Sequence, residues 1–337
     1  MPKLVASLFS GCGGLDLGFT GGFNYRGHDY PRLDTNIVFA NDFDVDAQTC
    51  YNANPLLTED GAECLLADIR TVDANDIPNF DILLAGFPCQ PFSNAGNRRG
   101  VEDANGRGTL FAECERIIQA KIANGHRPQA FVFENVRGIL SSKMPDGETT
   151  VPQEIINRMH ALGYDVSMRL LCAADYGVPQ KRYRVLIVGI DQELGLGEFN
   201  FDSLIDLVHD LNIPSENYGE HEELVLGRIL QGVNEAPDHD VWQFSPGTQQ
   251  TVDLIGGCAH GLEAFEHFHD GYHLADLPQV CFEGRSWKDI PYELLTPRFR
   301  NIADHPQQYH APKFFRRFAF GEICGTITAS AQPDKCG

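Results

Sequence analysis

A cysteine and a glutamate each follow a short apolar run, and together they could support covalent chemistry. Cys89 lies in the sequence GFPCQPFS at 86–93, directly after the apolar run 82–85, and Glu134 follows the run 129–133. Open α/β sheets gather their reacting groups where the strands end, at the carboxyl edge. The pattern therefore favours a thiol nucleophile with an acid beside it over an inert buried thiol and a helix-capping carboxylate.

A glycine-rich turn follows the first apolar run and predicts a ligand site. The sequence FSGCGG supplies Phe9, Ser10, Gly11, Gly13 and Gly14. Missing side chains let a ligand approach the backbone, although such turns also occur without any ligand. The Gly-x-Gly-Gly spacing differs from the Gly-x-Gly-x-x-Gly of dinucleotide folds, so a nucleoside cofactor without a diphosphate is expected.

Acidic and aromatic residues at later strand ends fit the same cofactor. Asp42 could accept both ribose hydroxyls, Phe43 could stack on an adenine, and Asp68 with Ile69 could hold the adenine amino edge. An acid at such a position is often only a helix cap. Because these features occur in the right order along the chain, a nucleoside site remains the preferred interpretation.

Alternating strands and helices over residues 3–190 predict an α/β fold with a doubly wound, mostly parallel, Rossmann-like sheet. The expected strands are 4–9, 37–41, 82–85, 130–133, 166–171 and 185–190, and the expected helices are 107–123 and 153–162. After Asp191 the sequence becomes acidic and interrupted by prolines, so a domain boundary is expected there.

Composition limits the compartment and the partners. No run approaches the roughly 20 apolar residues of a membrane helix, and the start lacks the layout of a secretory signal, so a cytoplasmic protein is expected. Ten scattered cysteines indicate reduced thiols, and the histidines match no standard zinc spacing, so no metal is expected. The net charge is −21, of which residues 191–310 contribute −17, and this opposes nucleic-acid binding by bulk charge. Basic clusters at 97–99 and 180–184 could still line a groove.

Seven blocks, taken in order, resemble the cytosine-5 DNA methyltransferases of bacteria and phages, which use S-adenosylmethionine. The blocks are FSGCGG at 9–14, NDFD at 41–44, DI at 68–69, GFPCQPFS at 86–93, GRGTLF at 106–111, ENV at 134–136 and YGVPQKRYR at 176–184. The resemblance implies a double-stranded DNA substrate in a restriction-modification or phage setting. It also implies that Gly86 and Pro88 lie beside the cofactor.

The resemblance further implies a covalent mechanism on a flipped cytosine. Carbon 5 of cytosine is too weak a nucleophile to attack a methyl sulfonium, so Cys89 is expected to add to carbon 6 first. Glu134 is expected to be protonated at the ring nitrogen edge, and Arg184, with Arg182, to hold the ring carbonyl. The base must leave the duplex for this chemistry, and residues 93–100 are expected to close over it.

The same resemblance divides the chain into a catalytic domain (1–190), a smaller target-recognition domain (191–310) and a segment that returns to the catalytic domain (311–337). The final motif of the family is missing, so a second subunit that supplies it, a truncated product or a differently closed pocket is expected. Transfer RNA is the nearest alternative substrate. A non-catalytic regulatory subunit is the alternative of another class, and the presence of both Cys89 and Glu134 argues against it.

Overall fold

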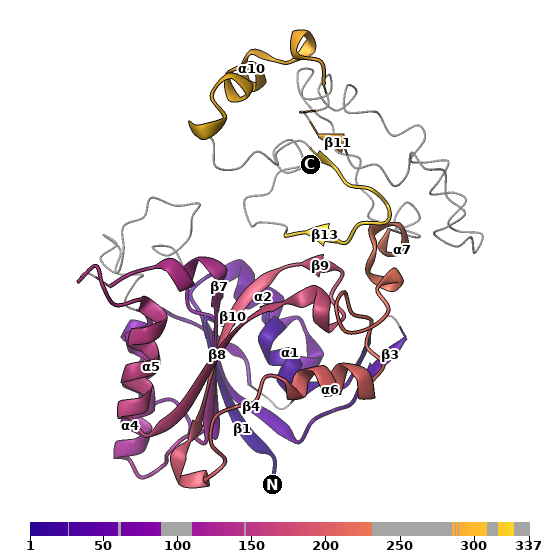
Figure 1. Ribbon diagram of the computed structural model, residues 1–337. Helices are drawn as coiled ribbons and strands as arrows, with labels where there is room; N and C mark the ends of the chain where they lie inside the picture. The colour runs from indigo at the N-terminus through magenta and orange to yellow at the C-terminus, as the bar shows by residue number, and fades with distance from the viewer. Residues whose placement is uncertain are drawn as a thin grey trace. The chain divides into compact units, whose positions relative to one another are not determined.

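Short buried runs of the chain build one seven-stranded sheet, in the order β5-β4-β1-β6-β7-β10-β8 (Figure 1). The strands are β1 (Lys3–Leu8), β4 (Thr35–Asp42), β5 (Cys64–Leu66), β6 (Ile82–Ala85), β7 (Ala130–Val136), β8 (Tyr164–Cys172) and β10 (Tyr183–Asp191). β1 pairs in parallel with β4 and β6, β4 with β5, and β6 with β7, whereas β10 is antiparallel to β7. The predicted doubly wound, mostly parallel sheet and its six expected strands are confirmed.

The sheet belongs to the first of two compact units of the chain. The computed structural model describes residues 1–25, 27–59, 62–88, 110–144, 146–230, 285–286, 288, 290–308 and 316–326. The first unit comprises residues 1–171 and 183–204, and the second comprises residues 172–182 and 205–337.

Helices cover both faces of the sheet (Figure 1). They are α1 (Gly14–Thr20), α2 (Val45–Asn52), α3 (Pro55–Thr58), α4 (Leu110–Ala123) and α5 (Val151–Ala161), and a hairpin of β2 (Phe23–Tyr25) and β3 (His28–Tyr30) follows α1. Successive strand residues point to opposite faces. Leu83 therefore packs with Ile117 of α4 and Ile155 of α5, whereas Leu84 packs with Tyr51 of α2 and Leu57 of α3.

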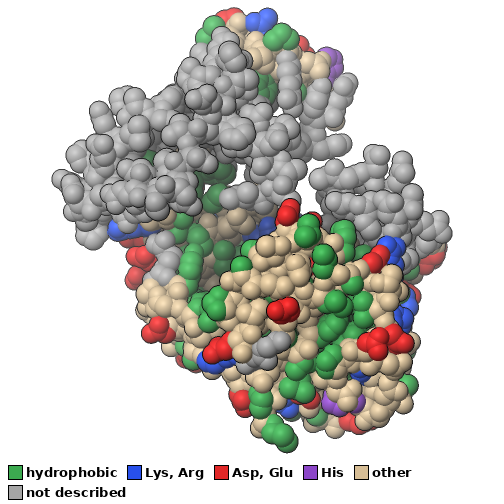
Figure 2. All heavy atoms as spheres, turned by 180° about the vertical axis from the view of Figure 1, so that it is seen from behind, with side chains coloured by type: hydrophobic (Ala, Val, Ile, Leu, Met, Phe, Trp, Pro, Cys, Tyr) green, Lys and Arg blue, Asp and Glu red, His purple; other side chains and the backbone are tan. Residues whose placement is uncertain are grey.

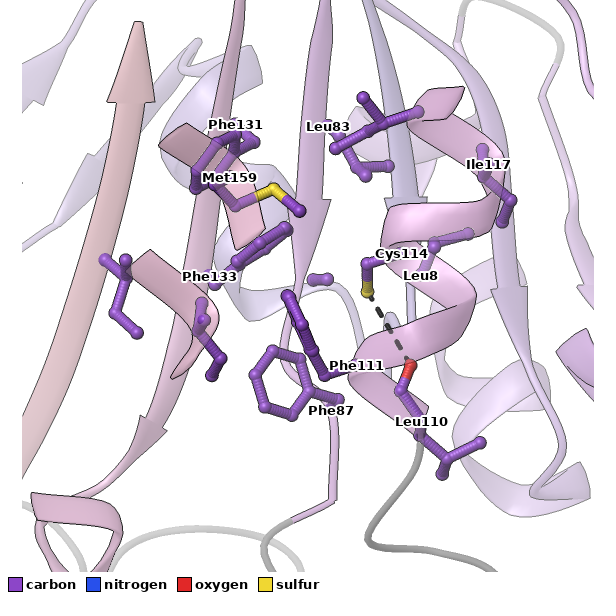
Figure 3. Close-up of a cluster of buried hydrophobic side chains, with 14 of the residues drawn as sticks. Leu8, Leu83, Phe87, Leu110, Phe111, Cys114, Ile117, Phe131, Phe133 and Met159 are labelled. Atoms are coloured by element: carbon purple, nitrogen blue, oxygen red, sulfur yellow. Dashed lines mark hydrogen bonds between the residues drawn. The ribbon is translucent and has the colours of Figure 1, made fainter. Parts of the chain in front are cut away.

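Three phenylalanines hold the chain on both sides of residues 89–109. Phe87 precedes this segment, Phe111 follows it at the start of α4, and Phe133 belongs to β7 (Figure 3). All three are buried, and their ring centroids lie 5.9, 6.0 and 6.1 Å apart in tilted or edge-on pairs. Aromatic rings attract each other in such arrangements. The described residues that flank Cys89 and its segment are therefore fixed at one place in the core.

The second unit contains shorter elements. They are β9 (Gln180–Lys181), α7 (Leu226–Ile229), β11 (Arg285–Ser286), α10 (Pro297–Asp304), β12 (Arg316–Arg317) and β13 (Cys324–Gly325), and α6 (Ser203–Asp210) leads into this unit from the first. β9 pairs in parallel with β13, and the Thr326 hydroxyl donates to the Lys181 carbonyl oxygen at 2.8 Å. A role of this unit in target recognition stays a prediction. No helix in the described ranges is long and apolar enough to cross a bilayer.

The aromatic cluster predicts a large stability effect at Phe111. Replacing Phe111 by Ala removes a buried ring from contact with Phe87 and Phe133, and truncations of this kind cost about 3 kcal/mol or more. Urea denaturation should show this loss, whereas Leu196→Ala, at a side chain that is 71% exposed, should stay within about 0.5 kcal/mol of the wild type. Similar midpoints for the two variants would contradict the role given to the cluster.

Candidate active site

The order in which the chain adds strands to the sheet reverses between β1 and β6. From β1 the chain proceeds to β4 and β5 on one side, and from β6 it proceeds to β7 on the other. Ligands of open α/β sheets bind outside the carboxyl ends of the strands at such a point. The Gly86 amide, just after β6, donates to the carbonyl oxygen of Leu8, the last residue of β1, at 3.4 Å. The glycine-rich turn and the segment that leads to Cys89 therefore start next to each other.

The positions of the turn are occupied by glycine for different physical reasons. Gly11 and Gly13 both have positive φ, 56° and 81°. A Cβ on Gly13 would lie 2.1 Å from Leu57 Cδ1 and 3.0 Å from Tyr51 Cδ2, so Gly13 is required by packing. A Cβ on Gly11 would meet no atom within 4 Å, and the same holds for Gly14. Open space at the backbone of these two residues fits the expected approach of a cofactor.

The turn is tied to the end of β4. Ser10 exchanges two hydrogen bonds with Asn41, from its amide to the Asn41 carbonyl oxygen (3.0 Å) and from the Asn41 amide to its hydroxyl (3.2 Å). The Gly11 amide donates to Asp42 Oδ2 at 2.8 Å, and the Asp44 amide donates to Asp42 Oδ1 at 3.0 Å. A carboxylate offers about four acceptor positions. Asp42 therefore retains capacity for the two ribose hydroxyls predicted for it.

The remaining residues of the predicted adenine site lie in different surroundings. Phe43 is 70% exposed, so its ring face is available for stacking. Asp68 caps a short 3-10 helix by accepting from the Arg70 amide and also forms an ion pair with the Arg70 side chain, which lowers the pKa of Asp68. Ile69 is buried in the core. Asp68 thus acts as a helix cap, and its contact with the adenine amino edge stays a prediction.

A buried carboxylate is connected to the turn by hydrogen bonds, and it was not predicted from the sequence. Asp16 lies in the first turn of α1 and is fully buried. Its Oδ1 accepts from the Ser7 hydroxyl at 2.7 Å, and its Oδ2 accepts from the Tyr51 hydroxyl at 2.9 Å. The Ser10 hydroxyl lies 2.9 Å from the Ser7 hydroxyl. These side chains come from four different segments, so periodicity along the sequence gives no signal for the network.

Glu134 and Arg184 meet beside the segment that leads to Cys89. Glu134 lies within β7, and its Oε1 forms an ion pair with Arg184 Nε of β10 at 2.5 Å. Its other oxygen, Oε2, lies 3.6 Å from the position that a Cβ on Gly86 would occupy. Both side chains are partly exposed. An acid and a guanidinium are therefore paired at the carboxyl edge, within reach of a ligand there.

Asn135 connects β7 to the same segment. Its side chain is buried and donates from Nδ2 to the Phe87 carbonyl oxygen at 3.2 Å. Because neighbouring strand residues face opposite sides of a sheet, Asn135 points toward the phenylalanine cluster while Glu134 points to the other face. Asn135 thus fixes the backbone two residues before Cys89.

The structure brings part of the predicted catalytic set together. Glu134 and Arg184 are in contact, and the half-buried Pro88 is the last described residue before Cys89. Cys89 itself, and the predicted closing segment 93–100, lie outside the described residues. Arg182 belongs to the second unit, where its carbonyl oxygen accepts from the Ala173 amide at 2.9 Å. The roles predicted for Cys89 and Arg182 stay predictions.

Comparison with known proteins points to one family. The model of the C-5 cytosine-specific DNA methylases matches residues 4–272. The type II methyltransferase M.NlaX of Neisseria lactamica is 36% identical over 68% of this chain and 64% of its own length. The type II methyltransferase M.HaeII of Haemophilus aegyptius is 35% identical over 70% of this chain and 66% of its own length. Among solved structures, the S. pombe Dnmt2 methyltransferase has a TM-score of 0.48 at 20% identity, over 71% of this chain and 62% of that chain. This chain thus spans about two thirds of the length of these two curated relatives.

The different surroundings of Gly11 and Gly13 give a first prediction for the site. Gly13→Ala should destabilise the fold strongly, because the new methyl group would collide with Leu57 and Tyr51. Gly11→Ala should cost only the backbone strain of a positive φ, about 1 kcal/mol. Denaturant unfolding of the two variants checks this difference, and equal losses would show that packing does not distinguish the two glycines.

The buried carboxylate gives a second prediction. Burial raises the pKa of Asp16 from 3.8 to about 6, against the opposing effect of the hydrogen bonds from Ser7 and Tyr51. The folded protein therefore holds this proton more tightly than the unfolded chain does. The stabilising contribution of the protonated Asp16 side chain to the free energy of unfolding is up to about 3 kcal/mol. It is fully present below about pH 4 and is lost as the pH rises through about 6.

Asp16→Asn tests this linkage, because the variant cannot ionise at that position. The free energy of unfolding of the wild type, relative to that of Asp16→Asn, should fall between about pH 4 and pH 7 in denaturant titrations. A difference that does not change with pH would contradict the raised pKa.

Proposed function

Because the chain belongs to the C-5 cytosine-specific DNA methylase family, whose members use S-adenosylmethionine, we propose that it methylates carbon 5 of cytosine in double-stranded DNA. The observation that carries this proposal is the Glu134–Arg184 pair beside Gly86, three residues before Cys89 on the chain. An acid and a guanidinium there match the donors that a cytosine ring requires at its nitrogen and carbonyl edges. The names of the related type II methyltransferases agree with this class of reaction.

The cofactor residues fit S-adenosylmethionine. Gly11 and Gly14 have open space at their backbones, Asp42 has spare acceptor positions, and the Phe43 ring is exposed. A nucleoside with ribose hydroxyls and an adenine ring would use these three kinds of contact. When bound, S-adenosylmethionine supplies an electrophilic methyl group on a sulfonium. The residues of this chain must hold it at the carboxyl edge of β1 and β4 and keep water away.

The protein's own groups would then make the cytosine ring reactive. In the proposed mechanism the Cys89 thiolate forms a bond to carbon 6, which makes carbon 5 electron-rich. Glu134 donates a proton at the ring nitrogen and so disperses the negative charge, while Arg184 binds the ring carbonyl. Carbon 5 takes the methyl group, a base removes the carbon-5 proton, and the bond from sulfur to carbon 6 breaks, while the ring nitrogen returns its proton to Glu134. Aromaticity and the free thiolate are thereby restored.

The base has to leave the duplex before it can reach these groups. Duplex binding must occur despite the strongly acidic composition of the chain. On the face drawn in Figure 2, the basic side chains of the described residues lie in small groups among acidic and apolar ones. DNA binding should therefore be assayed at low ionic strength, about 50 mM.

Transfer of labelled methyl from S-adenosylmethionine to mixed-sequence duplex DNA tests the proposal, with transfer RNA as a parallel substrate. Cys89→Ala should abolish transfer, and Glu134→Gln should slow it by at least about 100-fold, because it removes the proton donor. Glu193→Gln, at a side chain that is 79% exposed, is the matched control and should keep full activity.

Three outcomes would overturn this proposal or part of it. Label on RNA alone would change the substrate class. Full activity of Cys89→Ala would remove the covalent step. Absence of transfer to either nucleic acid by the wild type would contradict catalysis by this chain on its own.

A further inference from the structure

We propose that Asp16 is a positioning residue for S-adenosylmethionine binding, because its ionised carboxylate holds the glycine-rich turn in register with the end of β4. The inference rests on the proposed function, since it takes S-adenosylmethionine as the ligand of this turn. Asp16 itself is fully buried and cannot touch a ligand at the carboxyl edge. Its effect must pass through Ser7 and Ser10.

The hydrogen bonds around Asp16 have a fixed direction. A carboxylate only accepts, so both the Ser7 and the Tyr51 hydroxyls must donate to it. The Ser7 hydroxyl oxygen is then free to accept, and the Ser10 hydroxyl lies 2.9 Å from it and 3.2 Å from the Ser7 carbonyl oxygen. With its hydrogen so directed, the Ser10 oxygen can accept from the Asn41 amide. The chain of donors therefore runs from β4 through the turn to Asp16.

Loss of the charge would disturb this order. A protonated acid or an amide at position 16 carries its own hydrogens and must donate to one of its two neighbours. If it donates to Ser7, the Ser7 hydrogen must turn away from position 16, and the Ser10 oxygen, 2.9 Å away, can accept it. The Ser10 hydroxyl would then lose the Ser7 hydroxyl as an acceptor and turn to the Ser7 carbonyl oxygen, 3.2 Å away, which changes its orientation toward the Asn41 amide. Gly11 and Asp42, which are joined by the next hydrogen bond, depend on the same register.

Asp16 is also the member of the cluster that titrates near neutral pH. Two other titratable groups lie near it, Tyr51 from α2, which donates a hydrogen bond to it, and Cys64 from β5, whose pKa its charge raises. Burial raises the pKa of Tyr51 and raises the pKa of Cys64 to about 11, so both remain neutral below pH 8. Burial raises the pKa of Asp16 to about 6. The carboxylate therefore protonates in a range in which its two neighbours do not change.

Stability and cofactor affinity should consequently respond to pH in opposite directions. Protonation of Asp16 relieves the cost of a buried charge and stabilises the fold. The same protonation removes the acceptor that orients the turn, so affinity falls with the fraction of ionised protein. With a pKa of about 6, and a protonated form that binds roughly tenfold more weakly, the dissociation constant at pH 5.5 should be roughly three times that at pH 7.5. If Asp16 had a purely structural role, the affinity for S-adenosylmethionine would fall only at pH values where the fold is also destabilised.

Isothermal titration of the full chain with S-adenosylmethionine between pH 5.5 and pH 8.0 tests this inference. Asp16→Asn should bind roughly tenfold more weakly than the wild type at pH 7.5, with a dissociation constant that no longer changes with pH. Tyr51→Phe keeps the ring under Gly13 but removes one donor to the carboxylate. Its affinity should match that of the wild type at pH 8.0. As the pH is lowered, the affinity of this variant should begin to fall at a higher pH than that of the wild type.

Asp191→Asn is the matched control. Asp191 is a buried acid at the opposite edge of the sheet, where it caps a short 3-10 helix and pairs with Arg127. Its replacement should lower the thermal midpoint but leave the affinity and its pH dependence as in the wild type. Wild-type affinity of a folded Asp16→Asn variant, or an unshifted pH profile of Tyr51→Phe, would overturn the inference. Failure of the wild type to bind S-adenosylmethionine at any pH would instead contradict the proposed function.

Discussion

The parallel pairing of β1 with both β4 and β6 is the constraint on which the rest of the structure depends. β1 lies between these strands, and Val5, Ala6 and Leu8 are fully buried. Parallel strands require crossover connections, so each strand is followed by a segment that leaves the sheet at the same edge. The turn after β1, the acid at the end of β4 and the segment before Cys89 meet there for this reason. The candidate site is thus a consequence of strand order.

At this edge of the sheet, the residues that pack the core differ from the residues that are available to a ligand. Gly13, Phe87, Phe111 and Asn135 face the interior, and each has a neighbour that explains its type. Gly11, Asp42 and Glu134 lie on the open side and keep backbone or side-chain capacity for a ligand. The residues of the first group fix the positions of those in the second. A functional group on a rigid strand end is held more accurately than one on an unsupported loop.

Much of the first unit could be predicted from the sequence, because its strands are short apolar runs and its loops contain glycine. The six predicted strands are present, and Glu134 lies near the end of β7, beside Gly86. β5 escaped prediction because three residues give no periodic signal. The contact between Glu134 and Arg184 depends on the antiparallel insertion of β10 next to β7, which links residues 50 positions apart. The Asp16 network escaped for the same reason, since Ser7, Asp16 and Tyr51 come from separate elements.

The proposed covalent mechanism depends on Cys89 as the nucleophile. Incubation of the full chain with S-adenosylmethionine and duplex DNA that contains 5-fluorocytosine tests it most directly. Fluorine at carbon 5 cannot leave as a proton does, so an enzyme that adds a thiolate to carbon 6 stays bound to the DNA. A denaturant-resistant complex whose crosslinked peptide contains Cys89, absent in Cys89→Ala, is the predicted result. A complex mapped to another cysteine, or no complex from a preparation that methylates unmodified DNA, would contradict the role of Cys89.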